Sequence, residues 1–173
     1  APDHPGLFAT IAGAMALSSA NIVDAKIHTL TDGMALDTFT IQDGGAGGFS
    51  MVNDFSRLKI YISDAIQGKM QPARELARRR ERTMANHTEV FAVAPRALID
   101  NKASNTHTVI EVNGRDRPGL LHDVTSVITG EGVQISSALI STYGERVVDV
   151  FYVKDVFGLK IDRQERIDGL RQK

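Results

Sequence analysis

The chain contains one sequence pattern twice, and this duplication restricts its fold more than any other feature. Residues 3–7 read Asp-His-Pro-Gly-Leu, and residues 116–120 read Asp-Arg-Pro-Gly-Leu, 113 positions later. The residues that follow keep this spacing, which shortens to 112 after the next turn, so that Asp37 corresponds to Asp149. A repeat of this length is a small domain rather than one turn of a solenoid. We therefore expect two related domains.

Length and composition agree with two folded domains. The 173 residues are enough for two domains of about 70–90 residues each. The hydrophobic and charged fractions, 42% and 24%, are ordinary for a folded protein. The absence of cysteine excludes disulfides, thiolate metal ligands and a cysteine nucleophile. The net charge of −1 argues against nucleic acid as the main partner.

The sequence carries no pattern for membrane insertion or export. No apolar run approaches the ~20 residues that cross a bilayer, and the architecture of a signal peptide is missing. We therefore expect no membrane partner and a cytoplasmic location. The start at Ala1, without a methionine, is typical of a fragment of a longer protein.

Both copies predict the same order of helices and strands. The Pro-Gly turn opens a helix with apolar residues on one face, such as Leu7, Ile11 and Met15 in the first copy. Two runs rich in Ile, Val and Thr follow, and the short turn between them indicates an antiparallel hairpin. The predicted ranges are strands 21–30, 35–42 and 96–100 with helix 50–67 in the first copy, and strands 108–113, 134–142 and 146–154 with helix 162–172 in the second.

This order is β-α-β-β-α-β, the ferredoxin-like α+β arrangement. The first copy lacks its opening strand and the second copy lacks its closing strand, and both gaps would leave sheet edges exposed. Three explanations stay open: the fragment is cut there, or segments are absent, or segments are exchanged between the copies.

A basic segment joins the two copies. Residues 69–105 hold 8 basic and 4 acidic side chains, and most of the excess lies between Lys69 and Arg82. Pro72 can occupy the first position of a helix, and the Ala, Glu, Leu and Arg residues after it favour one. We interpret residues 69–86 as a solvated helical linker. An RNA- or phosphate-binding arm is the alternative, although no aromatic residue is interleaved there to stack on bases.

The duplicated turn and the strand after its helix resemble ACT domains. The resemblance rests on Asp-x-Pro-Gly-Leu before the helix and on Asn21-Ile22 or Gln134-Ile135 at the strand start. The pair is most similar to the C-terminal ACT tandem of bacterial protein-PII uridylyltransferase/uridylyl-removing enzymes, through residues 2–8, 22–29, 35–39 and 148–161 and the Arg-rich linker. The resemblance implies two ferredoxin-like ACT domains, residues 1–104 and 105–173, each an antiparallel sheet with helices on one face.

The resemblance also implies a function. In such enzymes the ACT pair would sense glutamine, and hence nitrogen status, and would allosterically switch the addition of UMP to PII and its removal. The partners are then glutamine or another small amino acid, the catalytic domains and, through them, PII. The catalytic domains would use Mg²⁺, whereas this segment predicts no cofactor. The alternative is an ACT module that binds no ligand and serves dimerisation or interaction, including a homodimer through its ACT faces.

No group of residues in the chain predicts catalysis. His122-Asp123 superficially matches a metal motif, but adjacent residues in a helix diverge by about 100° and rarely share a metal. The other histidines lack ligand spacing, and Gly44–Gly48 lacks the Lys and Ser/Thr of a phosphate loop, so we expect a flexible loop there. These histidines are His4, His28, His87 and His107. An enzyme that uses His122-Asp123 is a third hypothesis.

The duplicated turn can recognise each part of an amino acid. The N-terminus of a helix attracts a carboxylate, Asp3 or Asp116 can accept from an ammonium, and Asn21 or Gln134 can exchange hydrogen bonds with a side-chain amide. The alternative is that each aspartate only caps its helix. The predicted ligand-binding residues are Asp3, His4, Gly6, Leu7, Asn21, Ile22, Asp116, Arg117, Gly119, Leu120, Gln134 and Ile135.

Overall fold

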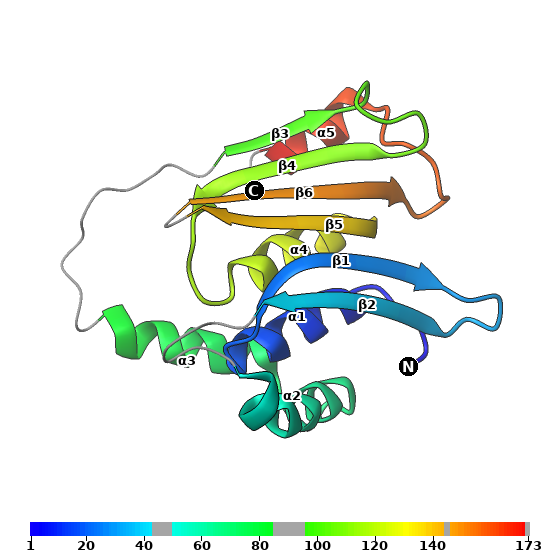
Figure 1. Cartoon of the computed structure of the whole chain (residues 1–173). Helices are drawn as coiled ribbons and strands as arrows, with labels where there is room; N and C mark the ends of the chain where they lie inside the picture. Colours follow the sequence, from blue (N-terminus) through cyan, green and yellow to red (C-terminus); the bar gives the residue numbers. More distant parts are fainter. Residues whose placement is uncertain (43–49, 85–95, 144–145, 172–173) are drawn as a thin grey trace.

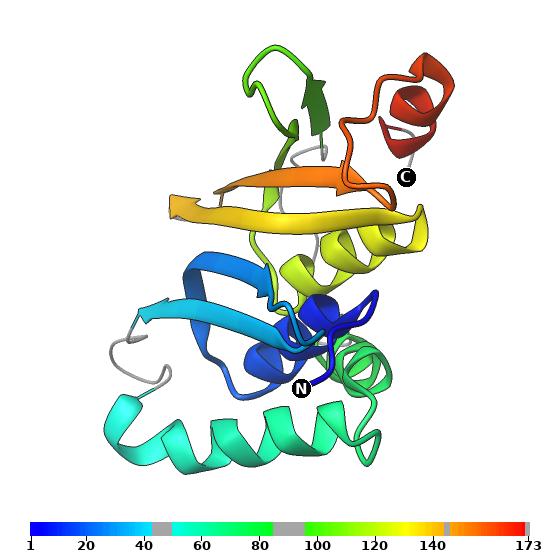
Figure 2. The ribbon, with the colours of Figure 1, turned by 90° about the vertical axis from the view of Figure 1, so that its right-hand side faces the viewer.

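The computed structural model of the chain describes residues 1–42, 50–84, 96–143 and 146–171. The described strands form one antiparallel sheet of six, in the order β2-β1-β5-β6-β4-β3 (Figure 1). Helices α1 and α4 lie on one side of this sheet (Figure 2). The elements are α1 (Leu7–Leu17), β1 (Asn21–Thr29), β2 (Ala35–Gln42), α2 (Met51–Ile66), α3 (Pro72–Met84), β3 (Arg96–Asp100), β4 (Thr108–Arg115), α4 (Leu120–Gly130), β5 (Val133–Tyr143), β6 (Arg146–Asp155) and α5 (Gln164–Arg171).

The strands follow the alternation of their side chains. Along β6, Val147, Asp149, Phe151 and Val153 are buried, and the residues between them are more exposed. This is the pattern of a sheet with one face packed on helices. The other face has no helix over it among the described residues, and the ferredoxin-like α+β class expected from the sequence is confirmed.

Helix α1 is more deeply buried than its sequence pattern indicates. Nine of its eleven residues are buried, because α1 contacts α2, α3 and α4 as well as the sheet. Met15 and Phe151 belong to the core that it shares with the sheet. Small residues such as Ala12 and Ala14 allow three helices to approach α1.

The two copies meet at equivalent positions. Strand β1 pairs with β5 over three residue pairs, and the central pair is Ala25 with Ala138, two fully buried residues that lie 113 positions apart. On the helical side, His122 Nδ1–H donates to the carbonyl oxygen of Ala9 at 2.8 Å, and these residues are also 113 apart. The copies are therefore related by a pseudo-twofold axis, as subunits are in an isologous dimer.

Strand β3 forms where the sequence predicts it, but not beside the rest of its own copy. It pairs with β4 from Arg96–Asn113 to Asp100–Val109, which is the place for the closing strand of the second copy. The missing closing strand of the second copy is therefore supplied by a segment assigned to the first copy, which is the exchange that the sequence left open. Helix α3 makes this exchange feasible, because it packs on α1 and reaches the turn before α4.

The outer edge of β2 carries only the beginning of a further strand among the described residues. Pro2 forms an isolated antiparallel bridge with Met34, and Ala35 N donates to Ala1 O at 2.8 Å. In the second copy the equivalent bridge, Arg115 with Arg146, begins the long ladder between β4 and β6. The described helices include none that is long and apolar enough to cross a membrane.

Candidate functional site

Both Pro-Gly turns end in a glycine that begins a helix. Gly6 and Gly119 adopt the left-handed conformation, with φ of 89° and 81°, which side chains other than glycine rarely adopt. No side chain caps either helix start. The alternative that Asp3 and Asp116 serve as helix caps is therefore wrong. The first-turn N–H groups of α1 and α4 consequently have no side-chain acceptor.

The first pocket joins the turn of the second copy to the strand start of the first. It is a cavity of about 930 Å³ between the copies. The turn from Asp116 to Leu120 lines one side, and Asn21 and Ile22 line the other. Six of the twelve predicted residues thus meet in one cavity: Asp116, Arg117, Gly119, Leu120, Asn21 and Ile22.

The second pocket has the reciprocal composition. Its cavity of about 950 Å³ is lined by Asp3, His4 and Gly6 from the first copy and by Gln134 and Ile135 from the second. Sequence reasoning placed each turn with the strand start of its own copy, and the structure corrects this to a crossed arrangement. Antiparallel pairing of β1 with β5 causes the crossing, because it carries each strand start toward the turn of the other copy.

Leu7 is the one predicted residue that lines neither pocket. Its side chain is only 2% exposed and belongs to the core. Its repeat partner Leu120 lies half-buried on the wall of the first pocket. The repeat therefore preserves the residue type at this position, but the surroundings differ between the copies.

Each pocket is also lined by a strand aspartate that the sequence prediction missed. Asp149 lines the first pocket and is 2% exposed, and Asp37 lines the second. Burial, together with the charge of Asp116, raises the pKa of Asp149 to about 6. Burial and the charge of Asp3 raise the pKa of Asp37 in the same way. The signal was present in the repeat, which aligns Asp37 with Asp149.

The linker helix α3 packs against the first pocket. Leu76 is 1% exposed, and a Cβ on Gly119 would lie 2.9 Å from its Cδ1 atom. Asp123 of α4 pairs with Arg80 of α3 at 2.7 Å and with Arg117 of the turn at 2.6 Å. Burial alone would raise the pKa of Asp123, but hydrogen bonds from both arginines lower it. The linker is therefore a packed helix on one face, rather than solvated all round.

The chain matches known proteins along its whole length. Residues 103–173 match the family model described as the ACR family N-terminal ACT domain. The second copy is therefore an ACT domain, and the first copy repeats its sequence pattern. It is 53% identical over its full length to the bifunctional uridylyltransferase/uridylyl-removing enzyme of Azospirillum brasilense. It is 52% and 51% identical, over 98% of its length, to the enzymes of the same name from Gluconobacter oxydans and Rhodospirillum rubrum. The chain spans 18% of the length of each relative. No solved structure matches it.

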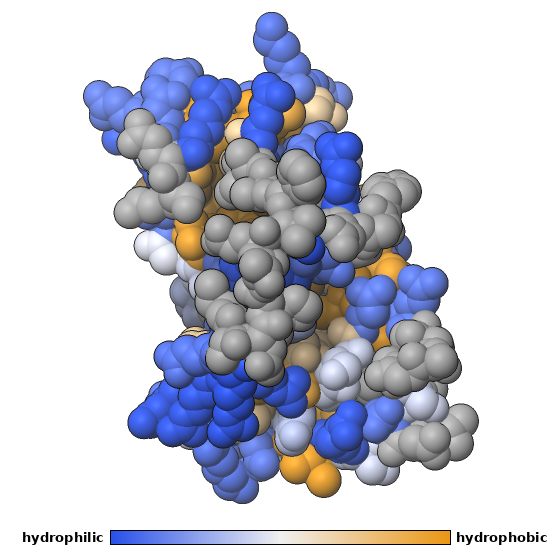
Figure 3. All heavy atoms as spheres, turned by 90° about the vertical axis from the view of Figure 1, so that its left-hand side faces the viewer, coloured by the Kyte–Doolittle hydropathy of each residue, from blue (hydrophilic) through white to orange (hydrophobic). Residues whose placement is uncertain are grey.

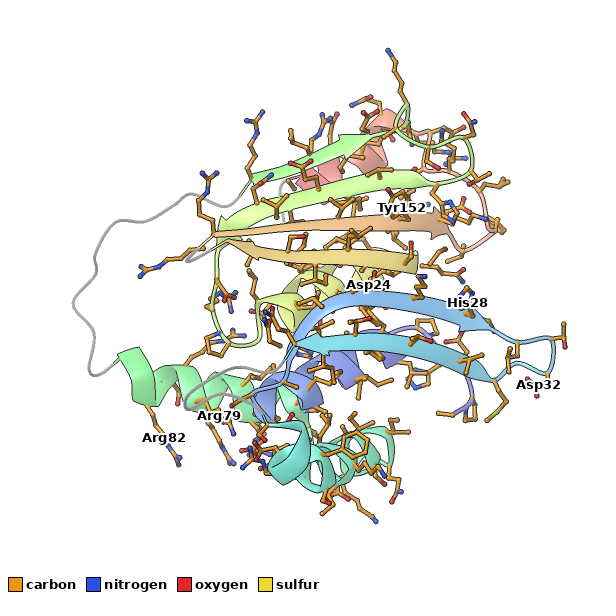
Figure 4. All side chains as sticks on the ribbon, viewed as in Figure 1. Asp24, His28, Asp32, Arg79, Arg82 and Tyr152 are labelled. Atoms are coloured by element: carbon orange, nitrogen blue, oxygen red, sulfur yellow. The ribbon has the colours of Figure 1, made fainter. Side chains whose placement is uncertain are left out.

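The two pockets of the ACT tandem differ in charge. Arginines of α3 and the turn line the first pocket, and the outer surface around α3 is mostly hydrophilic (Figure 3). Arg79 and Arg82 project from α3 in Figure 4. The second pocket has instead Lys26 and three histidines, His4, His28 and His107. There the Thr29 hydroxyl donates a hydrogen bond to Asp3.

The residues considered for catalysis have other roles in the ACT tandem. His122 joins α4 to α1, and Asp123 holds two arginines, so their side chains are directed to different neighbours. Within residues 1–42, 50–84, 96–143 and 146–171, no three His, Asp or Glu side chains lie together as metal ligands would. His87 and Gly44–Gly48 lie outside the described residues.

Proposed function

We propose that this chain is the amino-acid-sensing ACT pair of a bifunctional uridylyltransferase/uridylyl-removing enzyme, and that glutamine is its ligand. One observation carries the proposal: each pocket joins the helix-opening turn of one copy to the strand start of the other. The similarity to three such enzymes over at least 98% of the chain supports the choice of parent enzyme.

Each pocket offers a separate group for every polar part of an amino acid. In the first pocket, the N-terminus of α4 favours the carboxylate, because no side chain caps it and the helix dipole is positive there. Asp116 accepts from the ammonium, and the exposed amide of Asn21 pairs with a side-chain amide. In the second pocket, α1, Asp3 and Gln134 take the same roles.

Regulation follows from the crossed composition of the pockets. A ligand that touches both copies stabilises one arrangement of the two copies relative to others. That arrangement can then bias catalytic domains attached to the tandem, and with them the transfer of UMP to PII and its removal. Helix α3 contacts both α1 and the turn before α4, so it would register such a change directly. A cytoplasmic location of the parent enzyme is part of this proposal.

The second candidate is an interaction module that binds no ligand. The outer edge of β2 favours it, because backbone groups beyond the bridge of Pro2 with Met34 have no strand partner among the described residues. Such an edge can pair with another chain. Sedimentation over a range of protein concentrations would detect this association.

Isothermal titration with glutamine, glutamate and glycine tests the sensing function. We expect glutamine to bind more tightly than the other two, and Asn21→Ala to weaken the first site by about ten-fold through loss of its amide contact. Asn105→Ala is the matched control, because Asn105 is exposed and lines neither pocket. Absence of heat and of thermal stabilisation with glutamine in the millimolar range would reject the proposal.

A further inference from the structure

Two strand aspartates, the half-buried Asp37 and the buried Asp149, occupy equivalent positions in the two copies. Asp37 lies on β2 and Asp149 on β6, 112 positions apart, and both side chains open onto a pocket. Asp149 is nearly inaccessible to solvent and lies between the core residues Val147 and Phe151 of its strand. An apolar residue would be the ordinary occupant of such a strand position.

These carboxylates have few hydrogen-bond partners, and the backbone N–H of His28 is one for Asp37. Asp37 Oδ1 is buried without a hydrogen-bond partner. Asp149 accepts one long hydrogen bond, 3.4 Å from the backbone N of Ser141. Neither forms an ion pair with a described residue, and Arg117 nearby is paired with Asp123 instead. A buried carboxylate in this condition is costly, as at Asp149, and half-buried Asp37 repeats a smaller cost at the equivalent position.

A second carboxylate lies close to each of them. The charge of Asp116 contributes to the raised pKa of Asp149, and the charge of Asp3 contributes to that of Asp37. The same cavity is lined by Asp116 and Asp149 in one case and by Asp3 and Asp37 in the other. Each pocket thus contains two acids, one on the turn and one on the third strand, that repel each other while the pocket holds only solvent.

We propose that each pair, Asp116 with Asp149 and Asp3 with Asp37, is the receptor for the primary ammonium group of the ligand. An ammonium has three N–H donors and one positive charge, so it can donate to both carboxylates and relieve their repulsion. A proton held by the pair is released to solvent when the ammonium enters. The inference rests on the proposed function, and it assigns the strand aspartates a role that the turn aspartates alone cannot fulfil.

This assignment restricts the ligand class. The ligand must carry a free primary ammonium next to its carboxylate, because the carboxylate is directed to the helix N-terminus and the ammonium to the acid pair. Oxo acids and deaminated analogues leave two carboxylates facing each other without a cation, and they are disfavoured in both pockets. An N-acylated amino acid is excluded for the same reason.

A comparison of glutamine with its deaminated analogue, 5-amino-5-oxopentanoic acid, tests the proposal. Both ligands are titrated into the unmodified chain, Asp149→Asn, Asp37→Asn and the control Asp162→Asn, whose exposed side chain lines neither pocket. We expect Asp149→Asn to weaken glutamine at one site by about 10- to 100-fold and to leave the affinity for the analogue unchanged or higher. Asp37→Asn should do the same at the other site.

The outcomes separate this inference from the proposed function. If the unmodified chain does not bind glutamine, the proposed function fails and this inference fails with it. If the unmodified chain binds glutamine and Asp149→Asn binds it equally well, or loses glutamine and analogue to the same degree, only the ammonium receptor is refuted. Asp116→Asn, at the exposed turn, gives the same comparison should the buried substitution impair folding.

Discussion

Replacing Asp149 by asparagine is expected to stabilise the ligand-free chain at neutral pH. The folded chain binds a proton at Asp149 more tightly than the unfolded chain does, since burial raises the pKa from 3.8 to about 6. Where the folded state binds more protons, stability falls as the pH rises. Ionisation of Asp149 therefore reduces the free energy of unfolding between about pH 4 and pH 6, and the reduction persists above pH 6. Asparagine has nearly the same shape and no charge to bury.

The size of the effect follows from the difference in pKa. A difference of about two pH units, at about 1.4 kcal/mol for each, corresponds to about 3 kcal/mol at pH 7.5. At about pH 4 the carboxyl is largely protonated in the folded state and only about half ionised in the unfolded state, and the same relation leaves less than about 1 kcal/mol. Asp116, Arg80 and Arg117 are the charged groups that line the same pocket as Asp149, together with Arg79 and Arg82.

Thermal melts of the two proteins at several pH values between about 4 and 7.5 provide the measurement. The stability gained by Asp149→Asn should increase by about 2–3 kcal/mol across this range, which is about 5–10 °C in Tm for a chain of this size. Asp162→Asn should show no such trend, because its side chain is exposed. Two results would refute this reasoning: a stability difference between the two proteins that stays constant with pH, or an Asp149→Asn variant that is less stable than the unmodified chain at neutral pH. Either result would show that the ionised carboxylate has a stabilising partner.

Three further substitutions test the packing of the linker helix and of α1. Gly13→Ala should destabilise the chain by about 1–3 kcal/mol in urea unfolding, because the new Cβ would lie 2.6 Å from the side chain of Pro72 in α3. Gly130→Ala is the control and should not destabilise the chain, because a Cβ at Gly130 would meet nothing within 4 Å. Leu76→Ala should lower the free energy of unfolding by about 2–4 kcal/mol and speed tryptic cleavage in α3, because Leu76 is buried. Ala77→Ser, at an exposed position, is the control. Unchanged cleavage of Leu76→Ala would mean that packing does not hold α3 in place. Asp123→Asn should cost about 1 kcal/mol at neutral pH, since the pKa of Asp123 is lowered in the folded state. The loss should shrink as the pH falls through the lowered pKa, and a loss that does not change with pH would contradict the ion pairs.

The repeat made most of the secondary structure predictable. Strand β2 begins and ends where the sequence indicates, at Ala35 and Gln42, and β3 covers the predicted residues 96–100. Local signals are sufficient here, because alternation and turn residues are short-range properties. The placement of β3 was not predictable from them, since its partner β4 is chosen by tertiary packing.

The candidate site was predictable in its residues but not in its pairing. Eleven of the twelve residues named from the sequence line a pocket, yet Asp3 meets Gln134 rather than Asn21. The pairing depends on β1 lying beside β5, and nothing in the local sequence specifies which two strand edges join. The buried Asp149 escaped notice for a related reason: a polar residue on a strand looks solvent-facing until the register is known.

The crossed pockets make the pair of copies, and not the single copy, the unit that can bind. A protein with one such domain would need a second identical subunit to complete its sites, and symmetry would force both sites to be the same. Joining the two copies in one chain removes that constraint. One site has acquired arginines and a covering helix, and the other has acquired histidines, while the acid pair has stayed in both. A repeat within one chain thus permits two sites of related sequence to differ in their lining.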